Sequence, residues 1–553
     1  MAAIADGVAR SFRLFTPLQA YRLDIAGSLA GVIIFSILSF ISTPPVCWGV
    51  IVCLVYVVLL LKDLKLTDPV SIIQMMSLVL LTITLGNESL TAGFTWSPYY
   101  KIGIHDKMNG GYRVTVNGIP QQSIESIVLR KTHEPFYFIP YQRLPKNTTL
   151  NNVLIIGAGT GGDVAIALKE GARHVDAVEI DPRIYQIGKT LNPDHPYFDP
   201  RVTIHINDGR AFIQNLNATY DLIIFALPDS LTLVSGQSSL RLENYLFTLE
   251  SITKMRQHLS VNGIFAMYNY YREPWLIDRF ANTLATAFNH APCLDTYGAD
   301  KHWLSVLTID KTVSLMQCPQ LWQPISDKII QPSSDNHPFI YLKENRIPAL
   351  YLGSLLLILC ITITAIKVTG TTYRSLLNYT DLFLMGAAFL LLETKNIINF
   401  ALYFGTTWLV NALVFIGILM TVYLAIEVTS RVKFFNQHVL YGVLLVTLFI
   451  AWLIPEYYLL TLSLPLRFIA ATALAFAPIF VANLIFAERF RNTSHSTDAF
   501  GANLIGAMFG GVLEYISLVI GYHALIIVVA VLYTFAILFM PKHINKLATT
   551  GTV

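Results

Sequence analysis

A glycine-rich turn between an apolar strand and a helix is the feature of this 553-residue chain best suited to bind a nucleotide. Residues 157–163 read Gly-Ala-Gly-Thr-Gly-Gly-Asp and directly follow the apolar run NVLII. Glycines at such a turn allow a ligand to approach the backbone closely at a helix N-terminus. Glu179 and Asp208 end the next two expected strands, where a carboxylate can accept hydrogen bonds from ribose hydroxyls or an adenine amino group. Each acid could instead be an ordinary surface group at a strand end.

The spacing of these residues separates two classes of nucleotide-binding fold. The turn reads GxGxGG, whereas dinucleotide-binding folds carry GxGxxG. The two acids end successive strands, and no second mononucleotide-binding half follows them in the sequence. The pattern therefore favours an S-adenosyl ligand over NAD.

Bringing these residues together requires a sheet of mostly parallel strands, and the sequence predicts one. A hairpin comes first, because YYKIGIHD and YRVTVNGIPQQ flank Asn109, Gly110 and Gly111, which suit a tight turn. Strand-like runs then alternate with helix-like runs from NVLII to NGIFAMYNYY, with a helix over about 245–259. This alternation predicts a Rossmann-like α/β domain with an N-terminal β-hairpin subdomain.

The composition indicates that this domain is only part of the protein. The chain is 54% hydrophobic and 13% charged, against about 25% charged in an average soluble domain. Its mean hydropathy is +0.54, which excludes a disordered, collagen-like or ordinary soluble protein. Apolar stretches near the length of a membrane span, about 20 residues, occur at 25–42, 45–61, 70–86, 348–366, 381–403, 408–426, 437–454, 465–486, 499–520 and 523–540.

The expected organisation is an α/β domain inserted between two all-α transmembrane bundles. The boundaries are 1–92 for the N-terminal helices, 93–345 for the α/β domain, 346–543 for a C-terminal seven-helix domain and 544–553 for a tail. Such a chain is a multi-pass membrane protein in contact with lipids, and we expect it in a bacterial inner membrane.

Lys and Arg residues are concentrated in alternate connections between the spans. They include Arg10, Arg13 and Arg22, Lys62 and Lys65, Lys367 and Arg374, Arg431 and Lys433, Arg489 and Arg491, and Lys542 and Lys546. Cytoplasmic loops are enriched in these residues, so both termini are expected in the cytoplasm. Taken literally, the pattern places the α/β domain outside, which conflicts with a cytosolic nucleotide. The conflict disappears if segments 70–86 and 348–366 enter the membrane without crossing it.

Net charge and cysteine content argue against further classes of protein. Lys plus Arg number 38 and Asp plus Glu 35, and a net charge of +3 gives no general reason to expect nucleic-acid binding. Of the five cysteines, only Cys293 and Cys318 lie in polar sequence, and no CxxC spacing occurs. We therefore expect neither a metal site nor a disulfide framework.

Four polar residues within the apolar spans form a second candidate site, because ionisable groups in a membrane are costly unless they are paired or hydrated. They are Glu393, Lys395, Asn503 and Glu514. They could line a polar cavity for an amphipathic acceptor or a cation path, or form pairs that only fix helix packing. Gly506 and Gly510 form a Gly-x-x-x-Gly motif, which allows close helix packing.

The middle of the chain resembles the spermidine synthase (polyamine aminopropyltransferase) family over residues 95–290. The resemblance rests on segments in matching order: SPYYKI, VLIIGAGTGGDV, AVEIDPRI, PYFDPRVTIHINDGRAFI, YDLIIFALPDS and LFTLESITKMRQHLSVNGIFAM. Membrane-embedded relatives of this family, with helices on either side of the synthase-like domain, are known, and this chain resembles that branch.

The resemblance implies an aminopropyl donor and a polyamine acceptor. The donor would be decarboxylated S-adenosylmethionine, or S-adenosylmethionine itself if the site has changed. Glu179 would hold the ribose, Asp208 the adenine amino group, and Asp181 would lie near them. The turn residues Gly157, Gly159, Thr160, Gly161 and Asp163 would complete the donor site. Synthases of this type are often dimers, so a homodimer is implied by analogy.

Three residues depart from the family pattern: one where the family binds the donor's amine, one where it helps deprotonate the attacking amine, and one in its SPYQKI motif. The family carries an acid where this chain has Thr160, another where it has Ala226, and a Gln where it has Tyr100. An amine must lose a proton before it attacks, and nearby carboxylates bind the cation and take that proton. Asp229 and Tyr100 remain as candidate catalytic residues, and slow or absent aminopropyl transfer is expected.

Three functions are consistent with these motifs and with the departures from them. The leading one is a membrane-bound transferase that uses an S-adenosyl donor on a polyamine or a membrane-associated, amphiphilic acceptor. The second is a methyltransferase acting on a lipid or other amphiphile. The third is a polyamine or nucleoside sensor or transporter whose synthase-like domain binds ligand without turnover, which the loss of an acid at Ala226 favours.

Overall fold

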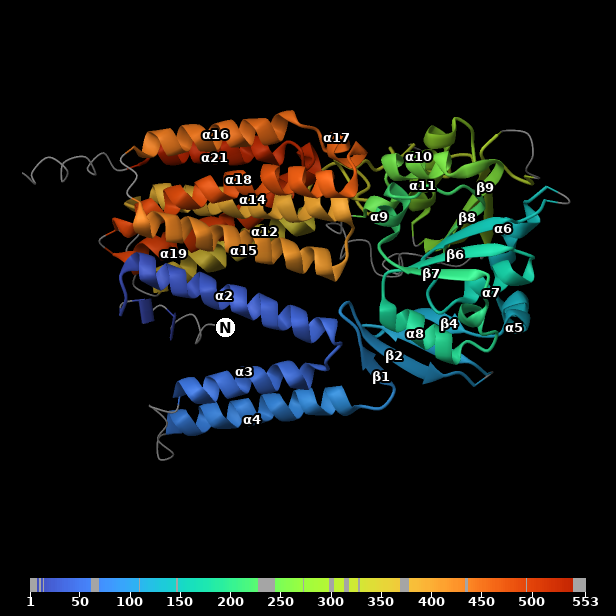
Figure 1. The fold of residues 1–553 in the computed structure, drawn as a ribbon, viewed down its shortest axis with the longest axis horizontal. Helices are drawn as coiled ribbons and strands as arrows, with labels where there is room; N and C mark the ends of the chain where they lie inside the picture. The colour runs from blue at the N-terminus through green and yellow to red at the C-terminus, as the bar shows by residue number, and fades with distance from the viewer. Residues whose placement is uncertain are drawn as a thin grey trace, which may run out of the picture. The chain divides into compact units, whose positions relative to one another are not determined.

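The computed structural model describes most of the chain as two compact units (Figure 1). The first comprises Met1–Ile33, Asp335–Phe404 and Leu409–Val553, and the second comprises Ile34–Ser334 and Gly405–Trp408. The described residues are 7–8, 11–12, 14–60, 69–108, 110–145, 148–226, 244–271, 273–297, 303–312, 318–326, 329–368, 377–432, 436–493 and 495–540.

The larger sheet of the second unit has the strand order β10-β11-β9-β8-β5-β6-β7. Its strands are β5 Asn152–Ile156, β6 His174–Glu179, β7 Val202–Ile206, β8 Tyr220–Ala226, β9 Leu259–Tyr271, β10 Cys293–Tyr297 and β11 Trp303–Asp310. The strands from β7 to β9 are parallel, and β11 and β10 are antiparallel to their neighbours. The chain continues from β5 to β6 on one side and later fills β8 on the other, so the order reverses at β5. Ligands of open α/β sheets bind at such a switch point, and the sheet confirms the predicted mostly parallel α/β domain.

After residue 126, the helices of this unit follow the predicted alternation with the strands. They are α5 Ile127–His133, η1 Pro135–Phe138, α6 Ile139–Gln142, α7 Gly162–Lys169, α8 Pro182–Leu191, η2 Pro196–Phe198, α9 Gly209–Gln214, η5 Tyr245–Phe247, α10 Leu249–Gln257 and α11 Pro274–Phe288. Side chains begin several of them, since Asp181 caps α8, Asp208 caps α9 and Thr248 caps α10. Each capping oxygen accepts a hydrogen bond from a backbone N–H that has no partner within the helix.

A smaller antiparallel sheet precedes the larger one. It contains β1 Phe94–Trp96, β2 Lys101–Asp106, β3 Tyr112–Val116 and β4 Ile119–Ile124. The predicted hairpin joins β2 and β3. Gly111 has a φ of 82°, and a side chain there would overlap the carbonyl of Ile124, so only glycine fits the turn. Asn109, the first residue of the predicted turn, lies outside the described residues.

Strand β5 anchors the glycine turn in the hydrophobic core. Val153, Leu154 and Ile155 are fully buried, as expected for a central strand covered on both faces. Burying each such side chain stabilises the fold by roughly 1.5–3 kcal/mol. The glycine turn that follows therefore begins at the end of a rigid, buried strand.

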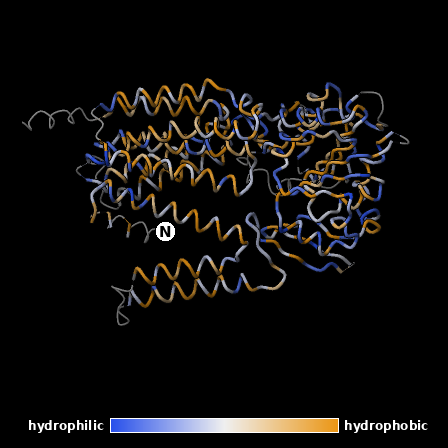
Figure 2. The backbone as a smooth tube through the Cα atoms, in the orientation of Figure 1, coloured by the Kyte–Doolittle hydropathy of each residue, from blue (hydrophilic) through white to orange (hydrophobic). Residues whose placement is uncertain are grey.

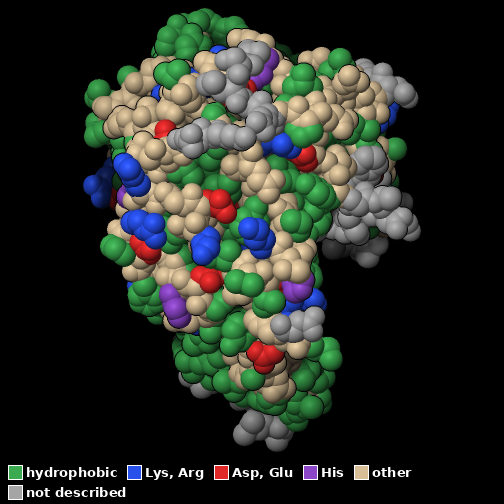
Figure 3. Space-filling model, turned by 90° about the vertical axis from the view of Figure 1, so that its right-hand side faces the viewer, with side chains coloured by type: hydrophobic (Ala, Val, Ile, Leu, Met, Phe, Trp, Pro, Cys, Tyr) green, Lys and Arg blue, Asp and Glu red, His purple; other side chains and the backbone are tan. Residues whose placement is uncertain are grey.

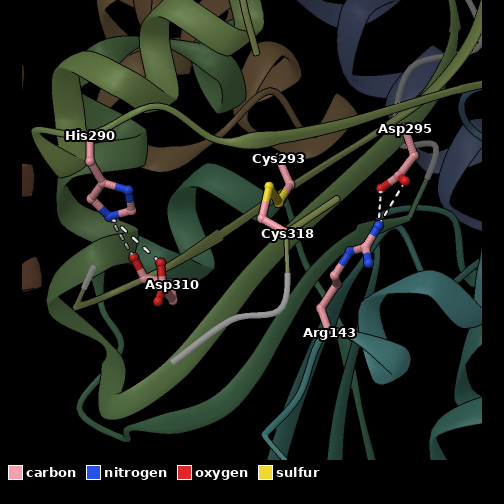
Figure 4. Close-up of a disulfide and its surroundings, with 6 residues drawn as sticks. All are labelled: Arg143, His290, Cys293, Asp295, Asp310 and Cys318. Carbon is pink, nitrogen blue, oxygen red and sulfur yellow. Dashed lines mark hydrogen bonds and ion pairs between the residues drawn. A yellow bond between two sulfur atoms is a disulfide. The ribbon is translucent and has the colours of Figure 1, made fainter. Parts of the chain in front are cut away.

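The cysteines correct one expectation, because Cys293 and Cys318 form a disulfide (Figure 4). The sequence showed two isolated polar cysteines and no reason to pair them. Antiparallel pairing of β11 with β10 brings the following segment back beside Cys293, and Leu294 N donates to Gln320 O at 3.0 Å. The pairing depends on strands after residue 271 that the sequence did not reveal.

The remaining helices are rich in apolar residues, as Figure 2 shows. They are α2 Pro17–Phe40, α3 Pro45–Leu60, α4 Pro69–Leu90, α12 Ala349–Val368, α14 Thr380–Phe404, α15 Trp408–Arg431, α16 Gln437–Leu453, α17 Glu456–Thr461, α18 Leu464–Arg491, α19 Ser496–Leu513, η6 Glu514–Ile516, α20 Ser517–Ile520 and α21 Leu525–Leu538.

Five helical segments of the described chain are long and apolar enough to cross a membrane. They are Pro17–Phe40, Ser71–Leu90, Trp408–Arg431, Leu464–Arg491 and Ser496–Ile520. Shorter apolar helices are Pro45–Leu59, Ala349–Thr364, Gln437–Leu453 and Leu525–Leu538.

Helices α14 and α19 pack closely through small residues in the first unit. A side chain at Gly506 would overlap the Phe383 carbonyl, and one at Gly510 would overlap the Ala387 carbonyl. The Gly-x-x-x-Gly motif therefore lets the two backbones touch, as small residues do between membrane helices.

Figure 3 shows one face of the molecule, on which acidic and basic side chains are interspersed. Ion pairs between neighbours are found in the second unit, such as Arg201 with Asp199 at 2.7 Å. The face in view therefore carries both positive and negative charges rather than charge of a single sign.

Candidate functional site

The glycine turn after β5 has the conformation that its sequence predicts. Gly157, Gly159 and Gly161 have φ values of 81°, 56° and 87°, in the left-handed region that glycine adopts without strain. The backbone N–H groups of Gly157 and Ala158 both donate to the Val178 carbonyl, at 2.9 and 3.0 Å. These bonds fold the turn back against the end of β6.

Glu179, at the end of β6, closes the turn. One carboxylate oxygen accepts from Gly159 N at 2.8 Å and the other from Asp181 N at 2.9 Å. Burial raises the pKa of Glu179 to about 7, although these two backbone bonds favour the charged form. A carboxylate has about four acceptor positions, so each oxygen keeps one for a further donor.

Asp181 lies next to this pair and links the two sheets of the unit. It caps α8 by accepting from Arg183 N at 2.8 Å, and its other oxygen accepts from Ser97 Oγ at 2.6 Å. Burial raises the pKa of this carboxyl, while the bond from Ser97 opposes that shift. Ser97 N in turn donates to the Tyr100 carbonyl, so the SPYY segment is held beside the glycine turn.

Asp208, the predicted adenine partner, has contacts at both oxygens. One accepts from Ala211 N at 2.9 Å as the cap of α9. The other accepts from Thr406 Oγ1 at 2.7 Å, and Thr406 belongs to the same compact unit. An adenine amino group would have to share or replace the Thr406 contact.

Asp163, in the first turn of α7, lies deeper in the domain. Tyr268 of β9 donates to its carboxylate through a short hydrogen bond. Burial raises the pKa of Asp163 to about 7, and the Arg130 guanidinium opposes the shift. The same Arg130 binds Glu134 at 3.1 Å and donates to the Ser123 carbonyl at 2.6 Å.

Several residues around the turn were not identified from the sequence as site residues. Gln122 accepts from both Thr160 N at 2.9 Å and Thr160 Oγ1 at 2.8 Å, and Tyr197 OH donates to the Gly159 carbonyl at 2.7 Å. Gln122 ends the hairpin segment NGIPQQ, and its approach to the turn depends on how the two sheets pack. No local pattern signals that contact.

At Thr160 and Ala226, the two positions where the resemblance implies acids, the structure shows the following surroundings. Ala226, at the end of β8, is 6% exposed and belongs to the hydrophobic core cluster of the sheet. Thr160 is engaged by Gln122, as described above. Asp229, a candidate catalytic residue, lies outside the described residues.

The second unit also contains a cavity of about 490 Å³. Its lining is mixed, with acids, bases and aromatic rings: Lys107, Glu125, His133, Glu134, Pro135, Phe136, Tyr270, Tyr297 and Leu304. Glu125 pairs with Lys107 and with His133 at 3.4 Å. Burial opposes ionisation of Glu125, but these partners lower its pKa overall. The acidic side chains that line the cavity are therefore largely paired with basic ones.

Lys395 and Asn503, two of the four polar residues predicted within the apolar spans, have separate partners in the first unit. Lys395 pairs with Glu456 at 3.5 Å, and Glu456 also meets His523 at 3.2 Å. A small cavity of about 30 Å³ adjoins Lys395 and Glu456. Asn503 instead donates to the Leu382 carbonyl at 3.1 Å, in the contact between α14 and α19.

Glu393 and Glu514 complete the predicted membrane set. Glu514 begins the short η6 segment and is 8% exposed, and Glu393 is partly buried on α14. Within the described ranges, no group of three or more His, Cys, Asp or Glu side chains could hold a metal ion.

Strand order, glycine turn and alternating helices together form an open α/β domain with a Rossmann-like fold. Residues 136–293 match the family model described as the spermine/spermidine synthase domain. The chain therefore carries a domain of the spermidine synthase-like family, as the sequence motifs predicted.

Curated relatives are similar to part of the chain. A polyamine aminopropyltransferase of Alkaliphilus metalliredigens is 28% identical over 176 residues, which cover 31% of this chain and 57% of that protein. Spermidine synthase 1 of Hyoscyamus niger is 42% identical over 101 residues, which cover 17% of this chain and 28% of that protein. The matched part thus spans less than two thirds of either relative.

A solved structure was also compared with the chain. The crystal structure of spermidine synthase from Thermotoga maritima is 19% identical, with a TM-score of 0.31, and the match covers 40% of this chain and 72% of that one.

Proposed function

We propose that the chain is a membrane-embedded transferase whose synthase-like domain binds an S-adenosyl donor and acts on a polyamine or a membrane-associated acceptor. The donor is decarboxylated S-adenosylmethionine or S-adenosylmethionine. Curated relatives named as aminopropyltransferases support this class of reaction. The apolar helices support a multi-pass protein with lipids as neighbours. The cytoplasmic position of both termini rests on the Lys and Arg residues of alternate connections, and a homodimer stays part of the proposal.

The observation that carries the proposal is the bond from Gly159 N to Glu179 at 2.8 Å. It fixes a carboxylate beside a left-handed glycine turn, at the point where the strand order reverses. A ribose placed there would donate its hydroxyls to the free acceptor positions of Glu179. Asp208, at the end of the neighbouring strand, is the proposed partner of the adenine amino group.

The test is binding of methylthioadenosine, measured by calorimetry on the full-length protein in detergent. Glu179→Ala leaves ribose hydroxyls and two backbone N–H groups without an acceptor, at about 1–3 kcal/mol for each lost bond. Affinity should fall about tenfold or more. Glu170→Ala is the matched control, because Glu170 is an exposed acid at the end of α7. Equal affinity of both variants would refute the assigned site, provided that both unfold near the wild-type temperature.

A second function, ligand binding without turnover, is supported by the burial of Ala226 in the core and the engagement of Thr160 by Gln122. Neither group can attract or deprotonate an amine. Incubation with donors labelled in the aminopropyl or methyl group distinguishes the possibilities. A labelled polyamine supports the aminopropyltransferase, a labelled lipid supports the methyltransferase, and tight binding without product supports the sensor or transporter.

A further inference from the structure

The disulfide links two segments that the backbone already holds together. Cys293 begins β10 and is 1% exposed, and its Cα lies 5.7 Å from that of Cys318, within the usual range for a disulfide. Leu294 N donates to Gln320 O at 3.0 Å, and Trp322 N donates to Pro292 O at 2.8 Å. The bond therefore joins a buried cysteine at the start of β10 to a half-buried one in a segment that backbone hydrogen bonds already hold beside it.

Nearby contacts fix the same strands without the sulfur atoms. Arg143 donates to both carboxylate oxygens of Asp295, each at 2.7 Å, two residues after Cys293. His290 contacts the carbonyl of Asp310 at the start of the hairpin (Figure 4). The sulfurs therefore meet in a prearranged position, and they will oxidise wherever the compartment permits it.

Structural disulfides persist in oxidising compartments and are rare in the cytoplasm, where thiols are kept reduced. The other cysteines, Cys47, Cys53 and Cys360, are free and lie in the apolar helices α3 and α12. The two cysteines of the synthase-like domain are thus the paired ones. This distribution indicates that the domain folds outside the cytoplasm.

The charges of the helix connections point the same way and are independent of the cysteines. Lys and Arg lie before α2, between α3 and α4, after α12, α15 and α21, and in the last turn of α18, whereas the turns at 41–44, 405–407 and 521–524 carry none. Cytoplasmic loops are the basic ones. Three crossings from a cytoplasmic N-terminus then leave the domain, which follows α4, on the other side.

The first unit shows where the chain returns from the domain. Asn336, just after the domain, accepts from Tyr522 N at 3.1 Å and from His523 N at 2.8 Å. Those residues belong to the turn before α21, which contains no Lys or Arg. The returning chain therefore meets the bundle at its non-basic end, opposite Arg489 and Arg491 at the end of α18.

We propose that the synthase-like domain lies on the extracytoplasmic side of the membrane and is closed there by the Cys293–Cys318 disulfide. Given the proposed function, its ligand is an adenosyl compound that has left the cytoplasm, and its acceptor is a solute or lipid of the outer side. The alternative in which segments 70–86 and 348–366 enter without crossing is then wrong.

The test uses the full-length protein in the inner membrane of an expressing bacterium, with Cys47, Cys53 and Cys360 replaced by Ser. Val261→Cys, 71% exposed at the start of β9, reports on the domain. Val432→Cys, 48% exposed just after α15, is the matched reporter at the basic end. An impermeant maleimide on intact spheroplasts should label only the first, and the second should react after lysis. Any other pattern, with a cytosolic marker protein unlabelled, overturns the proposal.

A thiol count on the native sequence gives the second readout. Denaturation in a polymer-linked maleimide without reductant should modify the three free cysteines, and all five should react after reduction. Modification of all five without reductant would contradict the proposal. Outside labelling without methylthioadenosine binding would remove the proposed ligand and leave the orientation standing, so the two failures are distinguishable.

Discussion

Ligand affinity should depend on pH through the carboxyl of Glu179. Burial raises its pKa to about 7, and only the ionised form can accept hydrogen bonds from two ribose hydroxyls while it also holds Gly159 N and Asp181 N. With that pKa, about a tenth of the carboxyl is ionised at pH 6 and about nine tenths at pH 8. The ligand selects the ionised form, so affinity is lost as the pH falls through 7. Methylthioadenosine should therefore bind about tenfold more weakly at pH 6 than at pH 8.

Calorimetry in two buffers of different ionisation enthalpy measures both the affinity and the proton released at pH 6. Asp163 also has its pKa raised to about 7 by burial, so it needs a control. Asp163→Asn should keep the pH dependence, whereas Glu179→Gln should abolish it. Equal affinity at pH 6 and pH 8, or a pH dependence that survives in Glu179→Gln, would refute the reasoning.

Three further predictions concern other parts of the chain. Aminopropyl transfer from decarboxylated S-adenosylmethionine to putrescine should be far slower than about 1 s⁻¹, the low end of ordinary enzymes, because Ala226 cannot take a proton, and general-base assistance typically contributes 10²–10⁴-fold. Ala226→Asp should raise the rate and Ala226→Asn should not; ordinary turnover by the wild type would contradict this. Ser97→Ala removes the 2.6 Å bond to Asp181 and should lower stability by about 1–3 kcal/mol, measured by thermal unfolding, with Ser260→Ala at a half-buried position of β9 as a control; an unchanged midpoint would count against the link. Gly510→Val should separate α14 from α19 and lower the unfolding temperature in detergent, whereas Gly442→Val, with open space around it, should not.

The local parts of the fold were predictable from sequence. The glycine turn, the hairpin with Gly110 and Gly111, and the alternation from β5 to β9 each leave a signal within a few residues. Glu179 and Asp208 were placed at strand ends because parallel strands end at one edge of a sheet. Their contacts with Gly159 and Thr406 were not predictable, because a strand end does not reveal what packs against it.

The features that the sequence missed all depend on distant contacts. Cys293 and Cys318 meet because β11 returns beside β10, and neither strand was identified. Lys395 lies two residues from Glu393 in the sequence, but the structure pairs it with Glu456 on α17. Pairs of this kind follow from the packing of whole elements, which no spacing along the chain encodes.

The central claim is that the domain keeps an adenosyl site but has lost the acids that bind an amine. The most direct measurement is calorimetry of the intact protein with S-adenosylmethionine, its decarboxylated form and methylthioadenosine. All three should bind through the shared adenosyl group, and the decarboxylated donor should have no advantage of about tenfold or more, the effect expected from one charged hydrogen bond. A clear preference for the decarboxylated donor, or no binding of methylthioadenosine, would contradict the account.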